Sequence, residues 1–179
     1  RPNRNPKFTQ KVLDNVPELV NDIYKPLYAR FQKQIPFTTD GLDSVYQPGD
    51  KYFVFAIQSM LYSLNEAFAQ YNFLTSTGLI KKYAYVCRCR FDLEFFAPVK
   101  FEDLDRHVIH IYDDCGHNPE WYNDHFAVSS SEIMGIYCST WENMYKYYKE
   151  GLPYLAEAFI GEQMKRANIK KQHIPIKYK

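Results

Sequence analysis

The chain has 179 residues, which is enough for one compact domain with a full hydrophobic core. Lysine and arginine total 22 and aspartate and glutamate total 21, so the net charge does not indicate a nucleic-acid partner. The sequence shows no signal peptide and no run of the roughly 18 apolar residues that a transmembrane helix needs. We therefore expect a cytoplasmic globular domain without a transmembrane segment.

Aromatic residues are abundant, with 16 Tyr, 13 Phe and 2 Trp. Tyrosine combines a flat apolar ring with a hydroxyl group, which suits stacking against a sugar and equally suits an ordinary core. Both interpretations remain open at this point.

The four cysteines show neither a C-x-x-C pair nor zinc-finger spacing. They are Cys87, Cys89, Cys115 and Cys138. We predict that all four are free, buried thiols in a reducing compartment.

The first fifty residues contain several helix breakers. Residues 1–15 are predicted to be a loose N-terminal segment, and a short helix over 17–24 is predicted to end at Pro26. Residues 28–37 fit a strand or an extended segment. Residues 38–50 are rich in turn-forming residues and indicate a surface loop.

The next segment carries the clearest helical pattern, over residues 54–71. Its apolar residues recur at helical spacing: Ile57, Met60, Leu61, Leu64 and Phe68. Three β-forming segments follow, and they predict strands over residues 83–93, 108–112 and 125–128.

A helix start is predicted after the third strand. Ser129 and Glu132 have the spacing of a capping box, and Gly151 is expected to end the helix. An apolar stripe marks its buried side: Met134, Tyr137, Trp141, Met144, Tyr145 and Tyr148. A last helix is predicted from Pro153 to about Asn168. The order of elements predicts an α/β layout with helices covering a small sheet.

The predicted strand over residues 83–93 carries three charged residues with a period of two. Arg88, Arg90 and Asp92 would share one face of the strand. Two guanidinium groups would keep the carboxylate ionised, and an ionised aspartate at the end of a strand can bind a hard divalent cation. The alternative is a half-exposed strand in which these side chains only form salt bridges.

A second polar cluster precedes the third predicted strand. A polar turn followed by a helix cap would account for Ser129 and Glu132, but it would not account for Asn123 and Asp124 together. The five histidines show none of the H-x-x-x-H or H-E-x-x-H spacings of a metal site: His107, His110, His117, His125 and His173.

Several segments act as landmarks through their order and spacing. They are residues 23–26 (IYKP), 58–63 (QSMLYS), 85–92 (YVCRCRFD), 123–127 (NDHFA), 130–134 (SSEIM) and the closing helix with Glu157 and Glu162. In these landmarks the chain resembles a family of GT-A-like glycosyltransferases of bacteria and viruses, associated with surface-polysaccharide biosynthesis. The resemblance runs from about Ile23 to Ile169.

The resemblance implies a fold and an activity. The fold would be α/β, a GT-A-like (Rossmann-like) mixed sheet flanked by helices, in a single domain over residues 1–179 that lacks the first nucleotide-binding strands. The activity would be metal-assisted transfer of a sugar from a nucleotide-sugar donor to a glycan or a glycosylated acceptor.

The resemblance also implies roles for individual residues. The set is Asp92 for Mn²⁺ or Mg²⁺; Arg88, Arg90 and Gln58 for the donor diphosphate; Asp124 as general base; and Asn123, His125 and Glu157 for acceptor or sugar contacts. The family commonly has Gln at the position of His125. The alternative function is a non-catalytic glycan-binding or assembly module on the same fold, which would not need Asp92 and Asp124 to face one cleft.

Overall fold

A computed structural model of the chain describes residues 35–37, 51–90, 93–112 and 118–174. Contacts between Cα atoms divide the chain into two units, residues 1–36 and residues 37–179. Every helix and strand given below belongs to the second unit. The predicted helix over 17–24, the loop over 38–50 and nearly all of the segments over 1–15 and 28–37 lie outside the described residues. The single-domain interpretation therefore stays a prediction.

A four-stranded mixed sheet lies at the centre of the second unit, with the order β1-β3-β2-β4. The strands are β1 (Val86–Cys89), β2 (Ile109–Ile111), β3 (Phe126–Ser129) and β4 (Lys171–His173). Strand β3 pairs antiparallel with both β1 and β2, whereas β4 pairs parallel with β2. In the register of the first pair, Arg88 lies opposite Ala127.

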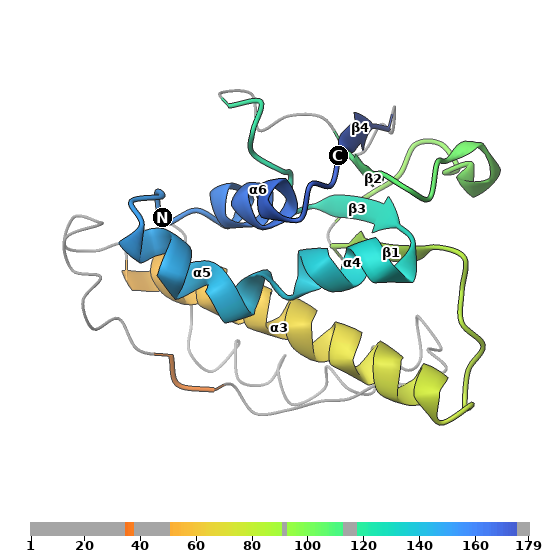
Figure 1. Cartoon of the computed structure of the whole chain (residues 1–179), viewed down its shortest axis with the longest axis horizontal. Coiled ribbons are helices and arrows are strands. Elements are labelled where there is room, and N and C mark those ends of the chain that lie inside the picture. Colours follow the sequence, from red (N-terminus) through yellow and green to blue (C-terminus); the bar gives the residue numbers. More distant parts are fainter. Residues whose placement is uncertain (1–34, 38–50, 91–92, 113–117, 175–179) are drawn as a thin grey trace. The chain divides into compact units, whose positions relative to one another are not determined.

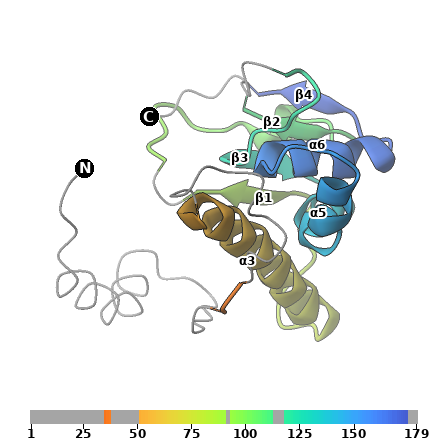
Figure 2. The same cartoon turned by 90° about the vertical axis from the view of Figure 1, so that its left-hand side faces the viewer.

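Four α-helices accompany the sheet in the described residues. They are α3 (Lys51–Ser76), α4 (Ser131–Cys138), α5 (Thr140–Lys149) and α6 (Ala156–Arg166), with one 3₁₀ turn, η1 (Phe101–Asp103). Helix α3 runs alongside α4 and α5 (Figure 1). Helix α5 contacts both α3 and α6 (Figure 2).

The two faces of the sheet belong to two different cores. On the helix side, Ala127, Ile109 and Ile111 pack into one buried cluster with residues of all four helices. On the other side, Phe126 and Val128 pack with Ile174 and with the segment over 93–104. Because side chains alternate along a strand, Arg88 lies on the same face as Ala127, the helix-covered face.

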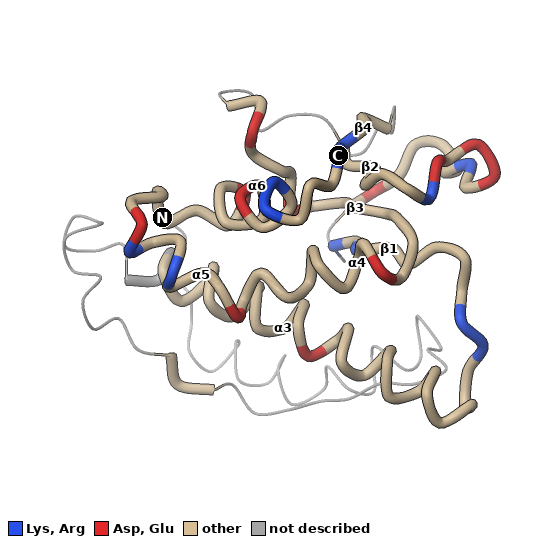
Figure 3. The backbone as a smooth tube through the Cα atoms, viewed as in Figure 1, with Lys and Arg blue, Asp and Glu red and all other residues tan. Residues whose placement is uncertain are grey.

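Charged residues are few along α3 and more frequent at the ends of α5 and α6 and around η1 (Figure 3). Helix α3, with 26 residues, has no acidic residue in its first turn and no basic residue in its last turn. No helix in the described part of the chain is long and apolar enough to cross a membrane.

The expected α/β class is confirmed at the level of a mixed sheet with flanking helices. The helix predicted over 54–71 is present and longer, as α3. The strand predicted over 83–93 is wrong in length, because within the described residues of that range only Val86–Cys89 form a strand paired with β3.

The predicted helix over 129–151 is two helices, which is a correction. The break lies at Ser139, whose hydroxyl donates to the carbonyl oxygen of Ile136 over 3.0 Å. The next residue, Thr140, also donates its hydroxyl to a carbonyl three residues earlier, that of Tyr137, over 2.8 Å. Hydroxyl groups that bond to the backbone in this way compete with the regular helix. Gln163 of α6 donates to Ser139 Oγ over 3.1 Å and fixes the break.

The predicted capping box is also wrong by one residue. Ser130 is the N-cap of α4, and its hydroxyl accepts from the Ile133 amide. Ser129 belongs to β3 and donates its hydroxyl to the Val108 carbonyl over 2.6 Å. Glu132 pairs with Lys82 at the protein surface.

The cysteines are free wherever they are described, but their predicted burial is wrong for two of them. Cys138 is buried, whereas Cys87 and Cys89 are exposed on β1. The reason is the register, because the face of β1 that carries Arg88 is turned toward the helices. Cys115 lies outside the described residues.

Candidate functional site

The end of β1 lies against the turn that precedes β3. The Arg90 amide donates to the His125 carbonyl oxygen over 3.1 Å, so the ladder between β1 and β3 continues one residue beyond the strand. Arg90 and His125 are therefore opposite each other, two residues along the ladder from Arg88 and Ala127. Arg88 and Arg90 share one face as predicted. Asp92, the predicted metal ligand, lies outside the described residues.

The turn before β3 buries Asp124. The Asp124 side chain is 12% exposed, and its Oδ1 lies 3.5 Å from Nε2 of His125. Asn123 shapes this turn, because its Oδ1 accepts from the His125 amide over 2.8 Å. Asn123 therefore closes an Asx-type turn, a local structural role that differs from the acceptor contact predicted for it.

Helix α6 brings Glu157 to the same place. Glu157 lies in the first turn of α6, and its carbonyl oxygen accepts from the Tyr122 amide over 3.2 Å. Burial raises the pKa of the Glu157 carboxyl, the charge of Asp124 raises it further, and His125 acts in the opposite direction. Glu157, Asp124 and His125 are thus close enough to influence one another's charge.

Tyr137 of α4 completes the group. Its ring is fully buried, and its hydroxyl has no hydrogen-bond partner among the described residues. Burial raises the pKa of Tyr137, the Arg88 charge opposes that rise, and Asp124 and Glu157 add to it. The charges of Arg88, Asp124 and Glu157 therefore all influence the Tyr137 hydroxyl.

Arg88 is the cation of this group, which we call the Arg88 cluster: Arg88, Asp124, His125, Tyr137 and Glu157. Its Nε is buried and makes no hydrogen bond within the described residues. A buried guanidinium N–H without a partner is costly, so it indicates a position that an anion, a water molecule or a ligand can fill. Arg88, Asp124, His125 and Glu157 were all predicted from the sequence.

Tyr137 was missed as a member of this group. In the sequence it belongs to an apolar stripe at helical spacing, and nothing distinguishes it from its neighbours in that stripe. Its role depends on the break at Ser139 and on the contact between α4 and β1, which are tertiary features.

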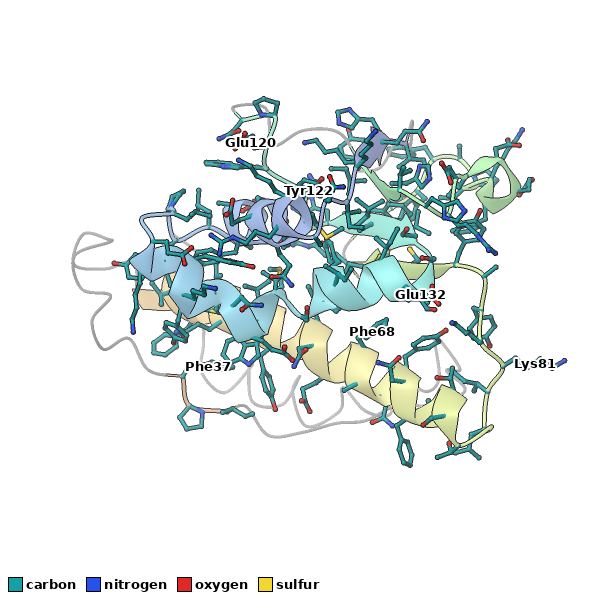
Figure 4. All side chains as sticks on the ribbon, viewed as in Figure 1. Phe37, Phe68, Lys81, Glu120, Tyr122 and Glu132 are labelled. Atoms are coloured by element: carbon teal, nitrogen blue, oxygen red, sulfur yellow. The ribbon has the colours of Figure 1, made fainter. Side chains whose placement is uncertain are left out.

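Close packing of α6 supports the turn that carries Asp124. A Cβ atom on Gly161 would lie 2.3 Å from the Glu120 carbonyl oxygen, so only glycine allows α6 to approach this segment. Figure 4 shows Tyr122 beside α6. Its hydroxyl donates to the Ile169 carbonyl over 3.2 Å, and the Lys171 ammonium group lies 4.9 Å from the centre of its ring. The turn is thus tied to both ends of α6.

Gln58 lies on another element. It is fully buried on α3, and its Nε2 donates to the Tyr145 hydroxyl of α5 over 2.5 Å. This bond joins two helices of the core. The donor-binding role predicted for Gln58 stays a prediction.

The described residues do not provide a metal centre. Within them, no group of three or more His, Cys, Asp and Glu side chains is placed to hold an ion. Asp92, the residue predicted to bind Mn²⁺ or Mg²⁺, lies outside the described residues, so the metal site stays a prediction.

The Arg88 cluster can perform two kinds of chemistry. A half-buried guanidinium attracts a phosphate or carboxylate group. A buried carboxylate next to an imidazole can accept a proton from a hydroxyl group that enters the site. Comparisons of the chain with protein-family models, with curated proteins and with solved structures found no match.

Proposed function

We propose that this chain is a glycosyltransferase of the GT-A-like type, which moves a sugar from a nucleotide-sugar donor to a hydroxyl group of a glycan or glycosylated acceptor. One observation carries the proposal. Strand pairing places Arg88 and Arg90 beside the turn that carries Asp124, and the bond from the Tyr122 amide to the Glu157 carbonyl oxygen ties the start of α6 to the same turn. A reaction that expels an anion and deprotonates a hydroxyl needs a cation and a carboxylate together.

Asp124 is the general base in this proposal. The acceptor hydroxyl gives its proton to the Asp124 carboxylate as its oxygen bonds to the sugar carbon. The bond between that carbon and the donor diphosphate breaks, and the diphosphate leaves with the electron pair. Burial of Asp124 suits the role, because little water would separate its carboxylate from a bound hydroxyl group.

Arg88 and Arg90 hold the departing diphosphate. They lie on one face of β1 and its continuation, two residues apart. Both guanidinium groups could contact one diphosphate if the two side chains converge on it. Guanidinium groups bind phosphate oxygens in pairs and stabilise the charge that develops on the leaving group.

Glu157 positions the sugar. Its side chain is half-buried in the first turn of α6, close to the turn that carries Asp124. A carboxyl group in this place can form hydrogen bonds with a sugar hydroxyl. His125, opposite Arg90, is exposed enough to reach the same ligand.

The test is a turnover assay with a panel of nucleotide sugars and a mixture of glycan acceptors, with and without Mn²⁺, in which release of the nucleoside diphosphate is measured. With the donor that turns over, Asp124→Asn is expected to lower kcat at least about a hundredfold, in line with the loss of a general base. Glu142→Gln is the control, because Glu142 is exposed on α5 and the variant removes one negative charge as well. Equal kcat values for the two variants would contradict the role of Asp124.

The alternative is a non-catalytic glycan-binding module, and one observation favours it. Three phenylalanines over residues 95–101 are exposed, Phe95, Phe96 and Phe101, and exposed aromatic rings suit stacking against sugars. This alternative predicts glycan binding without turnover, which weakens in Phe96→Ala and is unchanged in Asp124→Asn.

A further inference from the structure

The C-terminal end of α3 carries large apolar side chains that are exposed to solvent. Phe73 is 56% exposed, Leu79 in the turn after the helix is 68% exposed, and Tyr83 is 50% exposed where the chain continues toward β1. We call residues 72–83 the α3 tip. This end of α3 extends beyond α4 and α5 in both views of the molecule (Figure 1, Figure 2). Exposed apolar side chains that lie together in this way indicate a contact surface.

The turn of the α3 tip is held in one conformation by its backbone. The Leu79 amide donates to the Leu74 carbonyl oxygen over 3.0 Å. The Gly78 amide donates to the Thr75 carbonyl oxygen over 3.2 Å. These two bonds form a Schellman motif, and Gly78 supplies the left-handed residue that the motif needs, with a φ of 72°. Leu79 is therefore presented at a fixed position just beyond the helix.

Hydroxyl groups satisfy the backbone at the same helix end. Ser76 and Thr77 donate their hydroxyl groups to the Phe73 carbonyl oxygen, over 3.0 and 2.8 Å. The last four carbonyl groups of a helix have no partner within the helix itself. Here those of Phe73, Leu74 and Thr75 all accept hydrogen bonds, from hydroxyl groups or from the turn. The end of α3 can therefore leave water at a lower cost than a helix end whose carbonyl groups depend on solvent.

The charge around the α3 tip is positive. Residues 67–91 contain four basic residues and no aspartate or glutamate. Lys81 is exposed and points away from the molecule (Figure 4). Lys82 pairs with Glu132, and both of these side chains are largely exposed. The Tyr83 amide donates to the Tyr71 hydroxyl over 3.4 Å, which holds this segment beside α3. The tip thus combines exposed apolar side chains with two neighbouring lysines.

We propose that the α3 tip binds the surface of a bilayer that contains anionic phospholipid. Phe73 and Leu79 enter the boundary between the headgroups and the acyl chains, and the Tyr83 ring lies at the level of the headgroups. Lys81 and Lys82 contact lipid phosphate groups. Apolar insertion and attraction to anionic lipid add together in binding of this kind. The inference does not depend on the proposed glycosyl transfer.

Charge favours a lipid surface over a second copy of this chain. Two α3 tips in contact would bring the lysines of both copies together, and like charges repel each other. Anionic lipid neutralises the same lysines. The Glu132 carboxylate opposes binding to anionic lipid, and its ion pair with Lys82 offsets part of that repulsion.

The test is sedimentation of the 179-residue chain with two kinds of vesicle, one of phosphatidylcholine alone and one of equal parts phosphatidylcholine and phosphatidylserine. The chain is expected to bind the vesicles with phosphatidylserine far more strongly, and this binding should weaken as the salt concentration rises. Equal binding to both kinds of vesicle, or binding to neither, would overturn the proposal.

Three variants at exposed positions separate the apolar and the charged contributions. Leu79→Ser should lower the partition coefficient about tenfold at low and at high salt, because it removes apolar area that enters the bilayer. Lys81→Gln should lower it about fivefold at low salt, which is the expected contribution of one lysine near an anionic surface. Glu132→Gln should raise it, because the variant removes a repelling charge. Circular dichroism shows whether each variant is folded.

Two matched controls test whether the effects belong to the α3 tip. Phe96 is 61% exposed, close to the 56% of Phe73, but it lies on another segment, so Phe73→Ser should weaken binding and Phe96→Ser should not. Lys149→Gln removes one positive charge at an exposed position near the end of α5 and should bind like the unmodified chain. Equal losses for the two phenylalanine variants would contradict the site. A dimer that forms without vesicles and that Phe73→Ser converts into a monomer would also overturn the proposal, since the tip would then join two copies of the chain.

Discussion

Two glutamates in this protein occupy the same position of two helices, but their pKa values are shifted in opposite directions. Glu132 lies in the first turn of α4, is exposed, and has its pKa lowered to about 2, chiefly by its hydrogen bond to Lys82. Glu157 lies in the first turn of α6 and has its pKa raised, chiefly by burial. The first turn of a helix therefore does not determine the charge of a glutamate. Burial and partners determine it.

The contrast separates two regions of the molecule. In the Arg88 cluster, charged groups from β1, the β3 turn and α6 are partly or largely buried, so that a change at Asp124 alters the pKa of Glu157. Around the α4 N-terminus, charges face solvent, and each acts largely through its nearest partner. Substitutions in the buried region should therefore have large, pH-dependent effects, and substitutions in the exposed region small ones.

The largest effect on stability is expected from Gly161→Ala. Its Cβ would lie 2.3 Å from a backbone oxygen, which cannot move without shifting the whole segment that carries Asp124. We expect a loss of about 2 to 3 kcal/mol in the free energy of unfolding, measured by urea titration. Gly135→Ala is the control, because its closest contact is the Phe68 ring at 2.9 Å, a side chain that can rotate. A smaller loss for Gly161→Ala than for Gly135→Ala would contradict this packing.

Glu157→Gln should change the pH dependence of stability. Because the pKa of Glu157 is raised on folding, the folded protein binds this proton more tightly than the unfolded chain. Stability should therefore fall as the pH rises from the unfolded pKa through the raised folded one. Glutamine does not titrate, so the free energy of unfolding of the variant should rise relative to that of the unmodified chain between these two pKa values. The difference should then stay constant at higher pH. Urea titrations at a series of pH values measure the difference, and a constant difference would contradict the burial of the charge.

Tyr137→Phe should cost almost nothing in stability, although the residue is fully buried. Its hydroxyl has no partner among the described residues, so its removal breaks no hydrogen bond there. Tyr122→Phe is the comparison, because it loses the bond to the Ile169 carbonyl and should cost about 1 kcal/mol. Thermal unfolding of both variants gives the difference. A larger loss for Tyr137→Phe would show that its hydroxyl has a partner in the folded protein.

The smallest effect is expected from Lys82→Gln. Its ion pair with Glu132 is exposed to solvent, and such pairs contribute little to stability. The midpoint of urea unfolding should not change measurably at physiological salt. A clear loss of stability that disappears at high salt would show that the exposed region is more strongly coupled than we expect.

Much of the fold could be predicted from local pattern. Helical spacing of apolar residues located α3, and period-two spacing placed Arg88 and Arg90 on one face of β1. The break between α4 and α5 could not be predicted, because it depends on a contact between Ser139 and Gln163 of a different helix. Strand β4 was missed because its three residues are polar and only its parallel pairing with β2 makes it a strand.

The candidate site was predictable in composition but not in geometry. Arg88 was noted for its period-two spacing with Arg90, Asp124 for its polar cluster before the third predicted strand, and Glu157 only through the family resemblance. Their common influence on Tyr137 depends on how α4 and α6 pack against the sheet. That packing cannot be deduced from the spacing of the residues in the sequence. The positions of Cys87 and Cys89 illustrate the same limit, since alternation puts them on one face and only the tertiary structure determines which face is exposed.

The central claim is that Asp124 and Glu157 belong to one site, and an NMR titration of the side-chain carboxyl carbons tests it without a substrate. The pKa of Glu157 is measured in the unmodified chain, in Asp124→Asn and in Asp103→Asn, an exposed control in η1. Because the Asp124 charge helps to raise the pKa of Glu157, that pKa should fall in Asp124→Asn and stay unchanged in Asp103→Asn. A Glu157 pKa that is the same in all three proteins would contradict the claim.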